Sequence, residues 1–417
     1  MIPAAYPQLR LDAAALDHNI RVMADWCKTH DVALAPHVKT TMSAPIIERQ
    51  IAAGAVGVTV ATVDQVATVL GWGHNTVLIA NQIVDPFGLA RLRAWLAAEP
   101  ERKIRCFVDS AAGIAAAKQV FGAHGPALEV LLDIGTPGGR TGIRDPEQAR
   151  RTAELVRAAP GLRLVGVAGY EGVAPNTRTD ETLAAVDEHC RRVRDVYVDV
   201  AGLFETDRPV YSMGGSAFPD RVVDFLPTDD DVPGTIRLLR SGCYVTHDHG
   251  VYARVSPIPG LVPALAVRAV VVSAAEDGTA VVGAGKRDLP YDTETPILLS
   301  ASTAAGRDKS DVRGRVRALY DHHTVLSDAW NLEVTDVVEF GISHPCSAFD
   351  RWPEYLITND HGDVIDVWRS DFRRSSIATA LSESARRLDL RSELAEHDEN
   401  LAAARSADRD LTAQLNR

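Results

Sequence analysis

The segment Ala-Leu-Ala-Pro-His-Val-Lys at residues 33–39 opens a repeating pattern that decides the fold. It belongs to the first of eight short apolar runs, often β-branched, that are separated by longer stretches with helical character. Eight strands alternating with helices over about 240 residues predict a (β/α)8 TIM-like barrel, an α/β fold, with a doubly wound open sheet as the alternative. The runs lie at about residues 32–38, 56–61, 76–80, 104–108, 127–134, 163–169, 208–212 and 236–240.

The stretches between these runs are expected to form the helices of the barrel. Apolar residues recur in them at the spacing of one helix face. We expect helices at Ser43–Ala53, Val63–Leu70, Pro86–Ala98, Ala111–Phe121 and Pro146–Ala158.

After about residue 255 the sequence pattern changes, and strand-like runs are separated by turns that contain Gly, Asp and Pro. Such runs occupy Ala264–Ser273, Thr279–Val282 and Val334–Phe340, and Tyr355–Trp368 is typical of two strands around a hairpin turn at residues 359–362. A C-terminal, mostly-β domain is therefore expected to follow the barrel.

The length of 417 residues suits two domains. The predicted division is a barrel over residues 12–254 and a β domain formed by residues 1–11 and 255–375, with Gln8–Leu11 as a strand that leads into a helix near Asp12. Residues 376–417 have apolar positions at helical spacing, which predicts a helical C-terminal extension. This extension is either an oligomer contact or a solvated surface helix.

Composition excludes several classes of protein. Hydrophobic residues make up 46% and charged residues 24%, as in globular proteins. The net charge of −12 argues against nucleic acid as a partner. Apolar runs are too short for a membrane span, and the first residues do not resemble a signal peptide. Five scattered cysteines argue against a disulfide framework, so we expect a cytoplasmic protein.

Polar residues at the end of the first strand indicate a functional site at that end of the barrel. Strand alternation places Ala33, Ala35, His37 and Lys39 on one face, which suits a barrel interior with Lys39 at its mouth. A lysine there is costly unless it is paired or covalently used. The alternative is an amine that reaches the solvent at the barrel rim.

Loops after four later strands add residues that suit a cofactor. Arg140 can hold a carboxylate, a phenolate oxygen or a phosphate, and Tyr170 can flank a planar ring, although a core tyrosine is the alternative. Loops after strands seven and eight supply bare backbone N–H donors and hydroxyls, which a barrel phosphate site needs. The residues in these two loops are Gly214, Gly215, Ser216, Ser241, Gly242, Cys243 and Tyr244.

Pro-His-Val-Lys-Thr-Thr at residues 36–41 resembles the lysine motif of the D-serine dehydratase and D-threonine aldolase group of pyridoxal 5′-phosphate (PLP) enzymes. These are fold-type III enzymes related to alanine racemase. Residues 239–244, 285–288 and 342–346 are also similar to that group, and the resemblance runs through residues 5–370. It implies that Lys39 holds PLP as a Schiff base, and that the protein is a homodimer with active sites at the subunit interface.

The family's metal site is a His-x-Cys or His-x-Asp pair, and His344 and Cys346 match the first type. Residues two apart in a strand lie on one face and can chelate one ion. The cysteine favours Zn²⁺ over Mg²⁺. Asp321-His322-His323 departs from the relatives' Glu-Glu-His or Asp-Gln-His. The resemblance makes His323 a candidate acid or base, while His322 leaves the substrate in doubt.

The predicted activity is a PLP- and metal-dependent ammonia-lyase that dehydrates a D-β-hydroxy amino acid such as D-serine, D-threonine or 3-hydroxyaspartate. Cys346 favours this reaction over that of a D-threonine-type aldolase, which would cleave Cα–Cβ. An amino-acid racemase, which would need no metal, is a further alternative. A fourth possible function is that of a non-catalytic PLP-binding protein. Such proteins, however, are single barrels of about half this length and lack a β domain.

Overall fold

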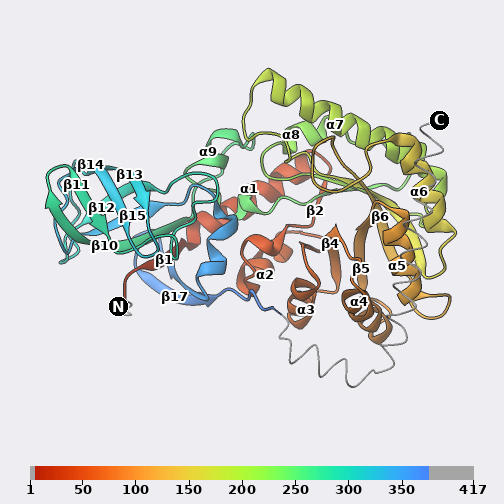
Figure 1. Ribbon diagram of the computed structural model, residues 1–417, viewed down its shortest axis with the longest axis horizontal. Helices are drawn as coiled ribbons and strands as arrows, with labels where there is room; N and C mark the ends of the chain where they lie inside the picture. Colours follow the sequence, from red (N-terminus) through yellow and green to blue (C-terminus); the bar gives the residue numbers. More distant parts are fainter. Residues whose placement is uncertain (1–4, 375–417) are drawn as a thin grey trace.

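The computed structural model describes residues 5–374, so the helix expected over residues 376–417 lies outside the described residues. Figure 1 shows two bodies side by side, a barrel surrounded by helices and a smaller β domain, with α1 (Ala13–Thr29) running between them. No helix within the described residues is long and apolar enough to cross a membrane.

Eight parallel strands form one sheet in the order β2-β9-β8-β7-β6-β5-β4-β3. Beyond β2, His37 makes a parallel bridge with Thr59 of β3, the strand at the other end of this order, and the bridge closes the sheet into a barrel. The barrel prediction is confirmed, and the open sheet was wrong. The strands are β2 (Ala33–Leu34), β3 (Val58–Val60), β4 (Thr76–Gln82), β5 (Lys103–Val108), β6 (Leu128–Ile134), β7 (Leu162–Gly169), β8 (Val210–Met213) and β9 (Ile236–Leu239).

The first barrel strand is shorter than predicted. It ends at Leu34, because Pro36 has no N–H to donate to a neighbouring strand. The carbonyl of Pro36 still accepts a hydrogen bond from the Thr59 amide at 2.9 Å, so the chain stays extended up to His37. The 3₁₀ turn η1 (Val38–Thr40) follows and carries Lys39.

All five predicted helices are confirmed to within one residue at each end, and their caps explain why. Asp85 and Asp145 accept hydrogen bonds from the amides of Gly88 and Gln148, and each is followed by proline at the first helical position. The helices after α1 are α2 (Ala44–Ala52), α3 (Val63–Gly71), α4 (Pro86–Ala98), α5 (Ala111–Phe121), α6 (Pro146–Arg157), α7 (Asp180–Asp199), α8 (Pro219–Val223) and α9 (Val251–Val255).

The inside of the barrel is filled by side chains from alternate strand positions, including Leu78, Phe107, Leu131 and Val210. Small residues take their place toward the mouth, where Ala61 and Ala80 line a cavity. A well-packed core therefore supports an open upper end, as the barrel fold requires.

The β domain is a nine-stranded sheet in the order β13-β14-β11-β10-β1-β16-β17, and β15 pairs with both β10 and β12. The N-terminal strand β1 lies between β10 and β16, and the side chain of Asp12 then caps α1. Strands β12 to β14 were not predicted. The strands are β1 (Gln8–Asp12), β10 (Leu265–Glu276), β11 (Thr279–Val282), β12 (Ile297–Ser302), β13 (Arg313–Leu319), β14 (Thr324–Trp330), β15 (Val337–Gly341), β16 (Glu354–Thr358) and β17 (Val364–Arg369).

Candidate active site

A cavity of about 240 Å³ opens at the carboxyl ends of the barrel strands. This is the end at which barrel enzymes carry their chemistry. Ten residues predicted from the sequence line it, and four predicted residues do not: Ser241, Tyr244, His323 and His344. The ten are His37, Lys39, Arg140, Tyr170, Gly214, Gly215, Ser216, Gly242, Cys243 and Cys346.

Lys39 lies half-buried in the wall of the cavity. Within residues 5–374, no carboxylate pairs with its ammonium group and no hydrogen bond involves it. Removing a charged amine from water without a partner is costly. The position therefore suits an amine that is used chemically, either as a covalent attachment point or as a base.

His37 lies beside Lys39 and is held as a neutral imidazole. Burial lowers its pKa well below the usual range, and the positive charge of Lys39 lowers it further. Its Nδ1 atom is buried and has no hydrogen-bond partner among the described residues. His37 therefore contributes an uncharged ring to the cavity wall beside Lys39.

Two arginines place positive charge around the cavity. Arg140 lies over the ring of Tyr170, with 4.7 Å between the guanidinium carbon and the ring centroid. Arg240 was not predicted as a site residue, although it directly precedes Ser241 in the motif at residues 239–244. It is buried, and donates hydrogen bonds to the Ser212 hydroxyl and to a backbone carbonyl, both at 2.6 Å. These bonds fix a cation in the cavity wall.

The glycine-rich turn after β8 differs from the prediction. The amides of Gly214 and Gly215 donate to the buried carboxylate of Glu171, at 3.2 and 2.6 Å, instead of facing the cavity as free phosphate donors. The predicted role of these two amides is therefore corrected. Only a folded structure could reveal this bond, since Glu171 lies 43 residues or more before its partners.

Three other amides are free to hold a phosphate. No residue in the described part of the chain accepts a hydrogen bond from the backbone N–H of Ser216, Gly242 or Cys243. Gly242 lies so close to the segment after β2 that a Cβ atom there would be 2.4 Å from the carbonyl oxygen of His37. A glycine at this position lets two backbone segments approach each other at the cavity wall.

Two predicted cofactor residues point elsewhere. The Ser241 hydroxyl donates to the carbonyl of Gly215, and the Tyr244 hydroxyl accepts from Gln50 at 2.8 Å in a buried contact with α2. These side chains support the cavity wall from behind and do not line the cavity.

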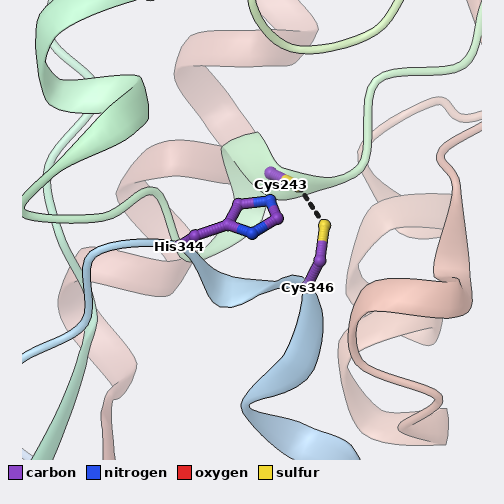
Figure 2. Close-up of side chains that lie close together, drawn as sticks. All are labelled: Cys243, His344 and Cys346. Carbon is purple, nitrogen blue, oxygen red and sulfur yellow. Dashed lines mark hydrogen bonds between the residues drawn. The ribbon is translucent and has the colours of Figure 1, made fainter. Parts of the chain in front are cut away.

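Three potential metal ligands converge beside Lys39. Figure 2 shows Cys243 on one segment and His344 and Cys346 on another, with the three side chains directed at one another. Their ligand atoms all lie within 4.8 Å of one another, and the two Sγ atoms are 3.1 Å apart. The pair predicted on a strand instead lies on a turn, because Pro345 begins the 3₁₀ turn η4 (Pro345–Ser347).

Asp292, which was not predicted, orients His344. Its carboxylate lies 2.7 Å from Nδ1 of His344 and accepts a second hydrogen bond from the Ser347 hydroxyl at 2.8 Å. Burial lowers the pKa of His344, but Asp292 and the Cys243 thiol outweigh it and raise the pKa to about 10. A carboxylate on one ring nitrogen is a common arrangement for a histidine that binds metal through the other.

His323 lies on an exposed turn between β13 and β14, outside the cavity. The turn packs on residues 285–288, since the amides of Lys286 and Arg287 donate to the carbonyls of Tyr320 and Asp321. The motifs at residues 285–288 and 321–323 are therefore in contact with each other. Within a single chain, neither of them reaches the cavity that contains Lys39.

Two family models match most of the chain. The model for "Alanine racemase, N-terminal domain" matches residues 11–218, and the model for "Putative serine dehydratase domain" matches residues 264–358. The chain belongs to the D-serine dehydratase and D-threonine aldolase-like family. Members of this fold-type III family are PLP enzymes with an alanine racemase-like fold.

Individual relatives within this family include both aldolases and dehydratases. D-Threonine aldolase from Arthrobacter sp. is 26% identical over 369 residues, which cover 88% of this chain and 92% of the relative. D-threo-3-Hydroxyaspartate dehydratase from Delftia sp. is 28% identical over 382 residues, covering 86% and 95%. The crystal structure of D-threonine aldolase from Filomicrobium marinum has a TM-score of 0.73 at 27% identity, covering 88% of this chain and 95% of that one.

The cavity of this family member fits PLP. It offers a lysine and three backbone amides that have no partner among residues 5–374, and Arg140 stacked on Tyr170 at the wall. These are the kinds of groups that a flat, anionic cofactor attached to an amine requires.

Proposed function

We propose that the protein is a PLP- and metal-dependent ammonia-lyase that dehydrates a D-β-hydroxy amino acid such as D-serine, D-threonine or 3-hydroxyaspartate. The observation that carries this proposal is that Lys39 and Cys346 line one cavity, with His344 directly beside Cys346. One substrate can therefore reach both groups. The Lys39 amine can act on its Cα, and an ion held by His344 and Cys346 can act on its β-hydroxyl.

Lys39 is the residue to which PLP would be attached, and the amides of Ser216, Gly242 and Cys243 would hold its phosphate. Arg140 and Tyr170 would contact its ring and phenolate oxygen. Bound PLP supplies an electron sink for the charge that develops when Cα loses a proton. Nζ of Lys39, once free, accepts that proton as a general base.

His344 and Cys346 would hold a divalent ion, most simply Zn²⁺. Hydroxide is a poor leaving group, and such an ion supplies Lewis-acid assistance worth several kcal/mol. Loss of hydroxide from Cβ gives an enamine, which hydrolyses to a keto acid and ammonia. The partly buried position of Cys346 beside Lys39 supports assistance at the β-hydroxyl.

A D-threonine-type aldolase is the second candidate. D-Threonine aldolase and 3-hydroxy-D-aspartate aldolase are among the relatives that align over most of this chain. In that reaction the same lysine and metal site would act, but the β-hydroxyl would lose a proton and Cα–Cβ would break. A racemase, which would move only the Cα proton, leaves His344 and Cys346 without a role.

The test is to incubate the purified protein with PLP, Zn²⁺ and a panel of D-β-hydroxy amino acids and to identify the products. We expect a keto acid and ammonia. Glycine and an aldehyde would instead establish the aldolase. Borohydride reduction should fix the cofactor on Lys39, and a peptide map that places it on another lysine would contradict the assignment.

Metal removal tests the role of the ion. Chelation should abolish product formation while the visible absorption of the bound cofactor remains, because Lys39 and the phosphate donors stay in place. Added Zn²⁺ should restore turnover in the unmodified protein, whereas Cys346→Ala should stay at least about 100-fold slower. Full turnover by the metal-free protein would exclude metal-assisted elimination.

A further inference from the structure

Cys243 lies where a third metal ligand would be. It follows β9 in the barrel, on the 3₁₀ turn η3 (Cys243–Val245), whereas His344 and Cys346 belong to the β domain. Its side chain is buried, and Figure 2 shows its sulfur facing both other ligands. We propose that Cys243 completes a Cys₂His zinc centre that spans the two domains, with one open position for the substrate's β-hydroxyl. The use of that open position rests on the proposed function.

The spacing of the sulfur atoms carries the first step. In a tetrahedral site, two sulfurs that each lie about 2.3 Å from one zinc ion are about 3.8 Å apart, slightly wider than the spacing between these two cysteines. Sγ of Cys243 and Sγ of Cys346 lie 3.1 Å apart, and both cysteines are free thiols. Thr40 caps the pair from the side, with its hydroxyl 3.8 and 3.9 Å from the two sulfurs.

The orientation of His344 carries the second step. Asp292 occupies Nδ1, so Nε2 is the ring nitrogen left for a metal. Ser347 in turn fixes the Asp292 carboxylate. A histidine whose ring is set by a carboxylate, which is itself hydrogen-bonded, is the outer shell that metal sites commonly have. An ordinary buried contact between two thiols would not require it.

The third ligand has chemical consequences. Two thiolates and one imidazole select zinc over the oxygen-preferring ions Mg²⁺ and Mn²⁺. Catalytic zinc sites have three protein ligands and one exchangeable position, and Cys₂His is an established set. A two-residue site would leave more positions to water and discriminate less between metals.

X-ray absorption at the zinc edge of the PLP- and zinc-loaded, unmodified protein tests the ligand set without any substitution. We expect two sulfur scatterers at about 2.3 Å and nitrogen or oxygen scatterers at about 2.0–2.1 Å. A single sulfur scatterer would overturn the proposal.

A pair of matched variants provides the second test. Cys243→Ser removes the proposed ligand, and Cys27→Ser makes the same change at a buried cysteine of α1. In cobalt-substituted protein, Cys243→Ser should lose about half of the thiolate-to-cobalt absorption and bind Zn²⁺ at least about tenfold more weakly. Cys27→Ser should match the unmodified protein. Equal spectra and equal zinc affinities in all three proteins would rule out Cys243 as a ligand.

These measurements separate the metal centre from the reaction. Two sulfur scatterers in a protein that turns over no D-β-hydroxy amino acid would support the Cys₂His centre and contradict the proposed function. One sulfur scatterer in a protein that makes keto acid and ammonia would do the reverse.

Discussion

His189, on α7 (Asp180–Asp199), is a buried histidine of the barrel. It is 2% exposed, and neither ring nitrogen has a hydrogen-bond partner within the described residues. Burial, helped by the charge of Arg192, lowers its pKa from 6.5 to about 4. The folded protein therefore holds this ring neutral at pH values where the unfolded chain protonates it.

This difference predicts a loss of stability in acid. Between pH 6.5 and 4 the unfolded chain binds the proton and the folded chain does not, so the contribution of His189 is fully present above pH 6.5 and is lost as pH falls through about 4. The loss is about 3 kcal/mol. We expect the free energy of unfolding of His189→Leu, measured with denaturant at pH 7 and pH 4.5, to fall less than that of the unmodified protein.

His361→Leu serves as the control, because it makes the same substitution at a histidine on the exposed turn between β16 and β17. Asp248, whose burial raises its pKa to about 6, acts in the opposite direction but is common to all three proteins and cancels in the comparison. Parallel curves for His189→Leu and the unmodified protein would contradict the prediction.

At the scale of elements, Glu171 joins the loop after β7 to the turn after β8. Its carboxylate is 1% exposed and accepts hydrogen bonds from Gly214 and Gly215. Such charge-assisted bonds are roughly twice as strong as neutral ones. They shape the turn immediately before Ser216, whose amide is one of the proposed phosphate donors.

Glu171→Gln keeps the shape of the side chain but removes its charge. We expect the dissociation constant for PLP, measured by absorption titration, to rise about tenfold, because one charge-assisted bond contributes about 1.5–3 kcal/mol and part of that loss falls on the turn. Glu205→Gln is the matched control. Its carboxylate, like that of Glu171, accepts a hydrogen bond from a backbone amide. The donor is Leu164 at 2.9 Å, near the start of β7 and away from the end of the strand that Glu171 follows. Equal PLP affinities in the two variants would disprove the role of Glu171.

At the scale of the whole molecule, one chain leaves His323 outside the cavity, on an exposed turn of the β domain. The sequence predicts both that His323 is an acid or base and that the active sites lie between two subunits. Both expectations are met together only if the turn of one protomer reaches the Lys39 cavity of its partner. Such an interface in a two-fold dimer contains two equivalent sites.

Mixing two inactive variants tests this arrangement. Lys39→Ala and His323→Ala should each be inactive alone. After unfolding and refolding together in equal amounts, about half of the dimers carry one variant of each kind, and one of their two sites has both residues intact. Lyase activity should then return to about a quarter of that of the unmodified protein. If His323 acts within its own chain, mixing restores nothing, and if it has no role in the reaction, His323→Ala is already active alone.

The accuracy of the helix and strand predictions follows from short-range interactions. The proline after Asp145 and the capping bond of that aspartate lie within four residues, so a helix start at Pro146 can be predicted from the sequence. Strand β13 has no comparable signal. Arginines occupy three of its seven positions and most of its side chains are at least partly exposed, so its identity depends on pairing with β14.

The sequence by itself determined the barrel, the β domain and the position of Lys39, because strand and helix periods, caps and turns act over a few residues and place the strand ends on one face. Only the tertiary structure decided which side chains face one another there. Glu171 takes the amides of Gly214 and Gly215, and Cys243 meets Cys346 across 103 residues of sequence. Such contacts depend on strand order and on how the two domains pack, which no local pattern encodes.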